Sequence, residues 1–306
     1  MQHIAAKKSH HKSTPIFQSG VPLRKIKSLG QHFLRSKEVL RKIIEAAAIK
    51  SGETVLEIGP GEGALTEALL LAGARVIAVE TDTRCVRKLE ERFTDHLNKK
   101  RLLLISGDIK QDEVQKKIFH KEFLGQSLYK LVANIPYYIT GMLFRLFLEK
   151  LRQPSALVFL VQKEVAEQIV AREGKESILS LSVKIYGTPR YVAKVKREAF
   201  SPPPKVDSAI VAVTDISRER LAGFTDEEYF RAVKTGLGAK RKMLLGNLAR
   251  ARLRPTSDGQ GLKIPKEELL KIFNALGIDE HVRGEDVPAE KWPILAQEIK
   301  NVKSML

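Results

Sequence analysis

The segment Thr54-Val55-Leu56-Glu57-Ile58-Gly59-Pro60-Gly61-Glu62-Gly63 decides the fold of this chain. An apolar run with the composition of a strand, 54–58, leads into a glycine-rich turn, and a helix-forming sequence follows. Glycine lets the backbone approach a ligand closely where a Cβ atom would collide, and such a turn between strand and helix is typical of nucleotide-binding α/β folds. The segment therefore predicts a nucleoside-type ligand at the end of the first strand.

Further apolar runs follow, separated by segments long enough for helices. The runs expected as strands are 54–58, 75–80, 101–106, 128–135 and 156–162. This alternation predicts a parallel sheet with crossover helices. A helix from Ser36 to the stop at Ser51-Gly52 should precede the sheet, because its apolar residues recur at helical spacing. Residues 177–186 alternate as a strand would, but their place in the order favours a helix.

Two closing strands, 191–195 and 208–214, should be joined by Pro202-Pro203-Pro204, which cannot be helical. After about Ile216 every periodic segment is helical. We therefore expect an α/β, Rossmann-like domain over 29–216 and a smaller all-helical domain over 217–306, preceded by a flexible basic arm over 1–28. The expected helices of the second domain are 227–237, 242–251, 266–276 and 290–302.

Positive charge is concentrated in two parts of the chain. The net charge is +17, and residues 1–42 carry 10 Lys and Arg against 1 Asp or Glu. Residues 183–254 carry 16 against 7, while the rest is nearly neutral. The pI of the whole chain is near 9.8. Two basic segments in a chain of this pI indicate a polyanionic partner such as RNA, and the alternative is that the charge serves only solubility.

Several classes of protein are disfavoured. The single cysteine, Cys85, cannot form an internal disulfide, and the seven histidines lack the spacing of zinc ligands, so no metal is expected. No run approaches the roughly 18 apolar residues of a membrane span, and the N-terminus lacks the apolar core of a secretory signal. We expect a cytoplasmic protein with no membrane contact.

Acidic residues follow the second and third runs. Glu80 stands where an acidic residue accepts ribose hydroxyl groups, but Glu80, Gly59 and Gly61 fit a dinucleotide as well as S-adenosylmethionine. Asp108 follows Gly107 after the third run, and it can accept a hydrogen bond from the amino group of a bound adenine. Gly-Asp is also a common turn opener.

The segment Asn134-Ile135-Pro136-Tyr137 follows the fourth run. Enzymes that transfer hydride with a dinucleotide cofactor do not use such a segment, so it argues against a dinucleotide. It offers the side-chain oxygen of Asn134 and the next backbone carbonyl as acceptors, made rigid by Pro136, beside the aromatic face of Tyr137. Two acceptors can hold both N–H groups of adenine N6 and favour a pyramidal, nucleophilic nitrogen. If such a nitrogen accepts a methyl group, it becomes a strongly acidic cation that loses its proton readily. Methyl transfer at this position therefore needs no catalytic base with a tuned pKa. An ordinary X-Pro turn is the alternative.

With these motifs the chain resembles the ribosomal RNA adenine dimethyltransferases of the KsgA type, over nearly its whole length from Lys27. Residues 29–34, Leu-Gly-Gln-His-Phe-Leu, are similar to that family's N-terminal cofactor-closing segment, and residues 200–208, Phe-Ser-Pro-Pro-Pro-Lys-Val-Asp-Ser, to its post-catalytic signature. The resemblance implies that Asn134 grips the target and that Tyr137 and Phe200 sandwich a flipped adenine. Burial of Phe200 in the core is the alternative. It implies S-adenosylmethionine as cofactor, bound by His32, Leu34, Gly59, Gly61, Glu80, Asp108 and Asn134.

The helical end resembles the family as well. Residues 238–248 lie where members carry a helix start of the Arg-Arg-Lys-Thr-Leu type, and here Lys240, Arg241 and Lys242 keep the charge while a hydroxyl is lost. We expect these three residues to bind RNA phosphates. The resemblance implies a monomer that N6-dimethylates two adjacent adenosines near the 3′ end of 16S rRNA, within a pre-ribosomal small subunit, as a step linked to ribosome assembly.

Two rival functions remain open. A large-subunit rRNA methyltransferase that confers macrolide resistance shares every motif of the first domain, although residues 238–248 favour the small-subunit enzyme. A ribosome-assembly or transcription factor could keep this fold as an RNA- or DNA-binding module with little catalysis. The intact Asn134, Asp108 and Glu80 argue against that loss.

Overall fold

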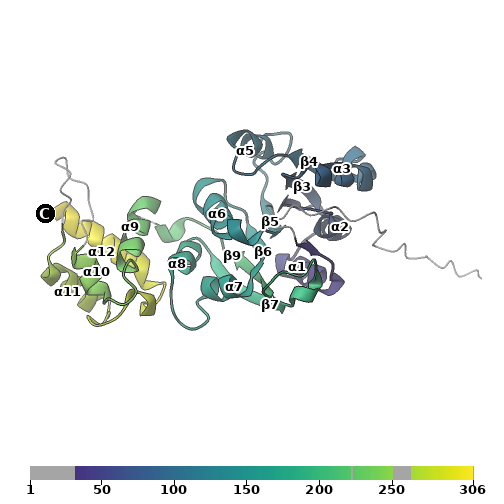
Figure 1. Ribbon diagram of the computed structural model, residues 1–306. Helices are drawn as coiled ribbons and strands as arrows, with labels where there is room; N and C mark the ends of the chain where they lie inside the picture. The colour runs from purple at the N-terminus through teal and green to yellow at the C-terminus, as the bar shows by residue number, and fades with distance from the viewer. Residues whose placement is uncertain (1–31, 222, 251–262, 306) are drawn as a thin grey trace, which may run out of the picture.

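The structure of the chain is a computed structural model that describes residues 32–221, 223–250 and 263–305, with side chains to residue 302 (Figure 1). Three expectations from the sequence lie outside these residues. They are the flexible arm over 1–28, residues 29–31 of the cofactor-closing segment, and residue 251 at the end of an expected helix.

A seven-stranded sheet forms the centre of the α/β part, in the order β4-β3-β2-β5-β6-β9-β7. The first five of these strands are mutually parallel, as the alternating runs predicted, while β9 is antiparallel to both β6 and β7. An antiparallel strand inserted near one edge departs from the 3-2-1-4-5-6 order of dinucleotide-binding domains. The strands are β2 (Thr54–Ile58), β3 (Arg75–Glu80), β4 (Leu102–Ser106), β5 (Tyr129–Asn134), β6 (Ala156–Gln162), β7 (Thr188–Val195) and β9 (Ser208–Thr214).

Helices cover both faces of the sheet, which is why its central strands are continuous apolar runs. Along β2 the side chains alternate, so that Val55 packs into one apolar core and Leu56 into the other. The core with Val55 takes in α1 (Lys37–Ala47), α2 (Ala64–Leu71), α3 (Thr83–Arg92) and part of α4 (Thr94–Asn98). The core with Leu56 takes in α5 (Asp112–Ile118), α6 (Thr140–Arg145), the π-helical turn η3 (Leu146–Lys150), α7 (Lys163–Val170) and α8 (Ile178–Lys184).

The segment 177–186 is helical, as its place in the order favoured. The side chain of Ser177 accepts from the backbone of Ser180, and the side chain of Ser180 accepts in return from the backbone of Ser177, so the two serines form a capping box. A cap of this kind satisfies backbone N–H groups that the first helical turn leaves without partners. The alternating apolar residues then fit a helix buried on most sides rather than a strand.

Four helices follow the sheet, preceded by the short 3-10 turn η5 (Glu219–Leu221). They are α9 (Asp226–Gly236), α10 (Leu244–Arg250), α11 (Lys266–Ala275) and α12 (Lys291–Met305), with the short turn η6 (Gly284–Asp286) before the last. They gather at one end of the molecule, beyond α8 (Figure 1). The apolar core beneath α8 continues among them without a break, through residues such as Tyr229 and Trp292.

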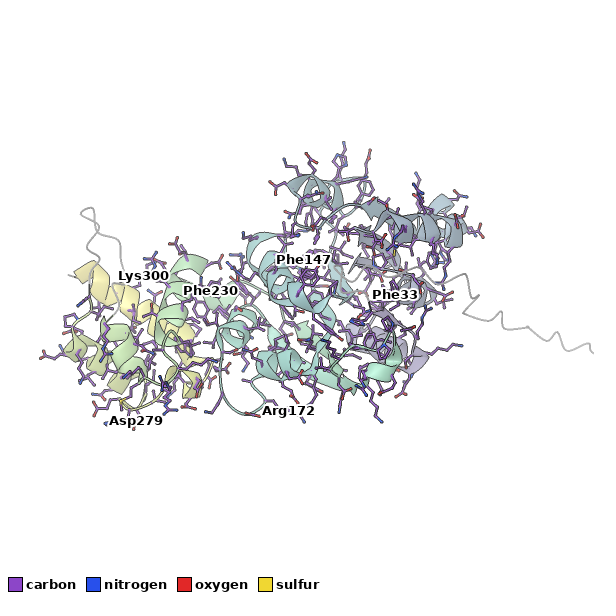
Figure 2. The ribbon with its side chains drawn as sticks, viewed as in Figure 1. Phe33, Phe147, Arg172, Phe230, Asp279 and Lys300 are labelled. Carbon is purple, nitrogen blue, oxygen red and sulfur yellow. The ribbon has the colours of Figure 1, made fainter. Side chains whose placement is uncertain are left out.

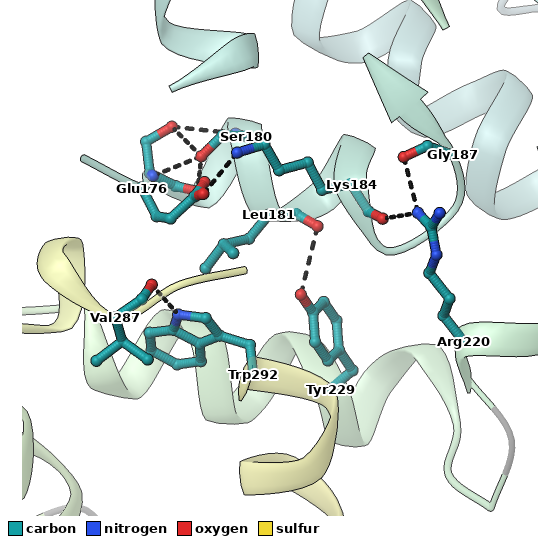
Figure 3. Close-up of polar contacts among 10 residues, drawn as sticks. Glu176, Ser180, Leu181, Lys184, Gly187, Arg220, Tyr229, Val287 and Trp292 are labelled. Carbon is teal, nitrogen blue, oxygen red and sulfur yellow. Dashed lines mark hydrogen bonds and ion pairs between the residues drawn. The ribbon is translucent and has the colours of Figure 1, made fainter. Parts of the chain in front are cut away.

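Polar contacts also join α8 to these helices (Figure 3). The hydroxyl of Tyr229 in α9 donates to the carbonyl of Leu181 in α8 over 3.3 Å, and the Arg220 guanidinium donates to the carbonyl of Gly187 over 2.9 Å. Lys184, the last residue of α8, forms an ion pair with Glu176, which precedes the helix and whose backbone N–H donates to the carbonyl of Glu285. The helical end is therefore packed against the α/β part rather than tethered to it by a linker alone.

The expected helix over 242–251 is wrong at its start. Helix α10 begins only at Leu244, and Lys240, Arg241 and Lys242 lie in the turn before it. The reason is tertiary: Met243 forms an isolated antiparallel bridge with Arg283, and the backbone N–H of Leu244 donates to the carbonyl of Val282. These contacts hold the segment extended.

Strand β7 also begins earlier than expected, at Thr188. It includes Pro189, which is tolerated because β7 is an edge strand.

Two helical glycines allow a matched test of packing. A Cβ added to Gly236, at the end of α9, would lie 2.6 Å from Leu244 Cδ1 and 2.6 Å from Trp292 Cη2, whereas one added to Gly246 in α10 would meet nothing within 4 Å. We expect Gly236→Ala to lower the free energy of unfolding by about 1–3 kcal/mol through overpacking. Gly246→Ala should leave it unchanged or raise it by about 0.5–1 kcal/mol, because alanine favours helices. Urea denaturation followed by circular dichroism measures both, and equal stability of the two variants would contradict the packing described.

Candidate active site

A pocket opens at the carboxyl ends of the central parallel strands. Its walls come from the turns after β2, β3, β4 and β5, together with the short strand β1 (Phe33–Leu34). Phe33, labelled in Figure 2, is part of this last wall. Ligands bind at this edge in open α/β sheets. Every residue expected to contact the cofactor lines the pocket, namely His32, Leu34, Gly59, Gly61, Glu80, Asp108 and Asn134, and so does Tyr137.

The glycine turn shapes the floor of the pocket. Gly59 and Gly61 have φ angles of +71° and +58°, in the left-handed region that favours glycine. A Cβ on Gly59 would meet nothing within 4 Å, whereas one on Gly61 would lie 2.9 Å from the Phe33 ring. Gly59 therefore leaves open space on the pocket side, which a ligand can occupy, and Gly61 makes room for Phe33. This open cradle fits a nucleoside cofactor.

The carboxylate of Glu80 is fixed at the end of β3 by backbone donors. It is 5% exposed and accepts from the N–H groups of Gly61, Thr81 and Asp82 over 2.9, 2.8 and 2.9 Å. Burial raises the pKa of Glu80, and the three backbone hydrogen bonds oppose that rise. These backbone donors hold the carboxylate in place. Its remaining lone pairs are therefore positioned to accept hydrogen bonds from the hydroxyl groups of a ligand.

Asp108 follows β4, the strand next to β3, and is more exposed than Glu80. Its carboxylate accepts from the backbone N–H of Lys110 over 2.9 Å and pairs with the Lys110 ammonium over 3.0 Å. Its side chain is about one-third exposed, at 32%. Lys110 could not be predicted from the sequence, because a lysine two residues after a turn carries no distinctive pattern.

Asn134 is held by the N-terminal segment. Its Nδ2 donates to the backbone carbonyl of His32 over 3.2 Å, which leaves Oδ1 as the acceptor of the amide. The ring of His32 is itself held by a 3.0 Å contact between Nδ1 and the carbonyl of Pro202, and it stacks on Tyr137 with 6.1 Å between centroids. The hydroxyl of Tyr137 adds a 2.8 Å hydrogen bond to Ser208 to this network of contacts. Three segments far apart in sequence are thereby locked around one acceptor.

Of the three residues expected to hold the target adenine, Asn134, Tyr137 and Phe200, only Phe200 is missing from the pocket lining. It is 4% exposed, pairs with Leu34 between the short strands β8 (Phe200–Ser201) and β1, and belongs to the apolar core on the α1 side of the sheet. In this structure Phe200 therefore packs in the apolar core. Its contact with a flipped base stays a prediction.

Sequence reasoning missed Glu57, a buried carboxyl group in the pocket wall. It is 1% exposed and accepts a 2.7 Å hydrogen bond from the Thr66 hydroxyl. Burial raises its pKa to about 8, and the charge of Glu80 adds to the rise. An acidic residue inside an apolar strand was the signal in the sequence that could have identified Glu57.

The described residues contain no group of three or more His, Cys, Asp and Glu side chains placed to hold a metal ion. Of the helices that these residues form, none is long and apolar enough to cross a membrane.

The sheet order, the glycine turn, the buried carboxylate of Glu80 and the Asn-x-Pro-Tyr turn together define a Rossmann-like methyltransferase that uses a nucleoside cofactor. The family model described as "Ribosomal RNA adenine dimethylase" matches residues 23–272, and the chain belongs to that family. Its methyl donor is S-adenosylmethionine, whose methionine part would lie against the cradle at Gly59 and whose ribose would be held by the carboxylate of Glu80.

Curated relatives and solved structures agree with this family. The "Ribosomal RNA small subunit methyltransferase A" of Dehalococcoides mccartyi strain CBDB1 is 44% identical over 91% of this chain and 90% of its own. The protein of that name from Fusobacterium nucleatum is 34% identical over 87% and 94%. A dimethyladenosine transferase from Plasmodium falciparum superposes with a TM-score of 0.69 at 27% identity, over 89% and 98% of the two chains. The 23S rRNA methyltransferase ErmE gives the same TM-score at 25% identity, over 88% and 99%.

The raised pKa of Glu57 predicts a pH-dependent stability. Between about pH 4.5 and about pH 8 the unfolded chain loses this proton while the folded chain keeps it. The free energy of unfolding should therefore fall as the pH rises through this window, and this contribution should level off above it. Glu57→Gln keeps the shape and cannot ionise, so its stability should decline less between about pH 5.5 and about pH 7.5. Urea denaturation at both pH values tests this, and identical declines in the two proteins would show that Glu57 is already ionised when folded.

Proposed function

We propose that this protein transfers methyl groups from S-adenosylmethionine to N6 of two adjacent adenosines near the 3′ end of 16S rRNA, two methyl groups to each, within a pre-ribosomal small subunit, as a step linked to ribosome assembly. The observation that carries the proposal is Asn134, which lines the pocket and whose amide nitrogen donates to the carbonyl of His32, so that its oxygen is left as an acceptor. Small-subunit rRNA is favoured over large-subunit rRNA because the relatives named for the small subunit reach 44% identity, against 25% for the large-subunit enzyme.

The chemistry follows from the acceptors at the end of β5. Asn134 Oδ1 and the carbonyl of Ile135 accept the two N–H groups of the target adenine, which turns the nitrogen lone pair toward the methyl group. The N6–C bond then forms as the C–S bond breaks, and the electron pair of that bond stays with sulfur. The methylated nitrogen gives up one proton to water. After the first transfer one N–H remains to be held, so a second methyl can follow on the same nitrogen.

Positioning supplies the rate acceleration in this scheme. Aligning nitrogen, methyl carbon and sulfur can lower a barrier by about 7–11 kcal/mol. The rigid parts that would provide it are the Pro136 turn and the network from Asn134 through His32 to Pro202. A base can reach this pocket only after leaving its stack, which costs a few kcal/mol.

RNA affinity is assigned to the helical end. Lys240, Arg241 and Lys242 are all exposed in the turn between α9 and α10, and a turn presents three consecutive cations more openly than a helix face does. The functional division we propose is a methyltransferase domain over 29–216 and an RNA-binding helical domain over 217–306, acting as a monomer in the cytoplasm, where ribosomal subunits are assembled.

Replacing Asn134 should separate catalysis from cofactor binding. We expect Asn134→Ala to lose at least about a hundredfold in methyl transfer, because one of two acceptors is gone. Calorimetry should find the affinity for S-adenosylmethionine within a few-fold of wild type. The assay measures labelled methyl in small subunits that lack these modifications, with large subunits in parallel, and Asn98→Ala at the exposed end of α4 serves as control. Methylation of large-subunit RNA alone would refute the substrate, and a fully active Asn134→Ala would refute the residue's role.

Neutralising the turn before α10 should weaken RNA binding without changing the target. Lys240→Gln, Arg241→Gln and Lys242→Gln together should lower affinity for RNA of any sequence, because phosphate contacts do not read bases. The slope of log affinity against log salt should fall by about one for each phosphate that the variant no longer binds. The matched control neutralises the exposed Lys116, Lys117 and Lys121, at and after α5, which belongs to the α/β part and lies away from the helical end in Figure 1. An unchanged slope in the first triple variant, or an equally weakened control, would place the phosphate-binding residues elsewhere.

A further inference from the structure

Tyr138 is an exposed aromatic residue at the mouth of the pocket. It is 69% exposed and belongs to the pocket lining, whereas the exposed apolar residues Leu71 and Leu128 lie outside it. Its neighbour Tyr137 already has its partners, since it stacks on His32 and its hydroxyl bonds to Ser208. The two adjacent tyrosines therefore have different roles, and the ring of Tyr138 is the one that remains open to a ligand.

The position of Tyr138 is rigid. It lies in the 3-10 turn η2 (Tyr137–Ile139), between β5 and α6 in Figure 1, and follows Pro136. The backbone N–H of Ile139 donates to the carbonyl of Pro136 over 3.1 Å, which closes the turn. A ring carried on a fixed turn loses little conformational entropy when a ligand covers it, so more of the contact energy remains as affinity.

A cation lines the same pocket as this ring. Lys110 belongs to the pocket lining, and its side chain is 59% exposed. The carboxylate of Asp108 holds the ammonium in place over 3.0 Å while leaving it open to solvent. An aromatic face with an adjacent cation is the combination by which proteins hold single-stranded nucleic acid, since the ring stacks on a base and the cation pairs with a phosphate.

We propose that Tyr138 and Lys110 form a subsite for the nucleotide next to the target adenosine, with its base on the Tyr138 ring and its phosphate at Lys110. The proposal rests on the proposed function, because it needs an RNA strand that delivers a flipped base to Asn134. Flipping one base removes the stacking partner of its neighbour, and the exposed ring replaces that partner. A single ring with one cation is far smaller than a stable protein interface, which favours a nucleotide over a protein as the occupant.

The kinetic test uses small subunits that lack the methyl groups, at saturating S-adenosylmethionine. We expect Tyr138→Ala to lower kcat/KM by about tenfold, and Tyr138→Phe, which keeps the aromatic face, to stay within about twofold of wild type. Lys110→Gln should lower the salt slope of RNA affinity by about one. Leu128→Ala and Lys42→Gln are matched controls, because the first removes an exposed apolar side chain and the second an ion-paired lysine, both outside the pocket lining. The affinity for S-adenosylmethionine is measured in each variant, since Lys110 touches Asp108.

A binding cycle separates a stacking contact from a structural effect. The probes are short single-stranded RNAs with two adjacent adenosines, either intact or abasic at the position 5′ or 3′ of the pair. We expect wild type to lose about tenfold in affinity when one of these bases is missing, and Tyr138→Ala to show no such difference. Wild-type kcat/KM in Tyr138→Ala, or an unchanged preference for the intact RNAs, would overturn the subsite. A wild-type protein that methylates no small-subunit RNA would instead refute the proposed function.

Discussion

The parallel pairing of β2 with β3 on one side and β5 on the other is the constraint on which the site depends. Register places Ile58 beside Val79 and Glu57 beside Val132, so the three strands end at nearly the same level. Their carboxyl ends therefore deliver the glycine turn, Glu80 and Asn134 to a single edge. Backbone hydrogen bonds then lock this arrangement, because Gly61 donates directly to Glu80. The cofactor pocket is a consequence of strand register more than of any one side chain.

The antiparallel strand β9 adds the second half of the site. It lies between β6 and the edge strand β7, so it returns the chain to the side of β6 and brings Ser208 within hydrogen-bonding distance of Tyr137. The short pairing of β1 with β8 does the same for the N-terminal segment, which reaches Asn134 through the carbonyl of His32. A dinucleotide-binding sheet without the inserted strand would leave these segments apart.

The helical end shares its apolar core with one face of the sheet. Tyr229 and Trp292 are buried in the same cluster as Leu181 of α8, so the surface of the helical end has a fixed position relative to the pocket (Figure 3). This rigidity matters for a substrate as large as folded RNA. Phosphate contacts set the register of a bound strand, and a fixed distance between the basic turn and Asn134 would select which nucleotide reaches the acceptors.

The sequence by itself determined the class of fold, because the apolar runs, the glycine turn and the Asn-x-Pro-Tyr turn depend on local backbone chemistry that neighbouring residues specify. It also identified the pocket residues His32, Glu80, Asp108 and Asn134. Only the tertiary structure decided which partners complete them. Helix α10 starts at Leu244 because a distant strand-like contact at Arg283 holds the preceding residue extended, and Phe200 is buried because β8 pairs with β1. Likewise the elevated pKa of Glu57 and the open ring of Tyr138 arise from burial and neighbours that no local pattern encodes. Local patterns record backbone preference, whereas burial and long-range pairing depend on which segments meet after the chain has folded.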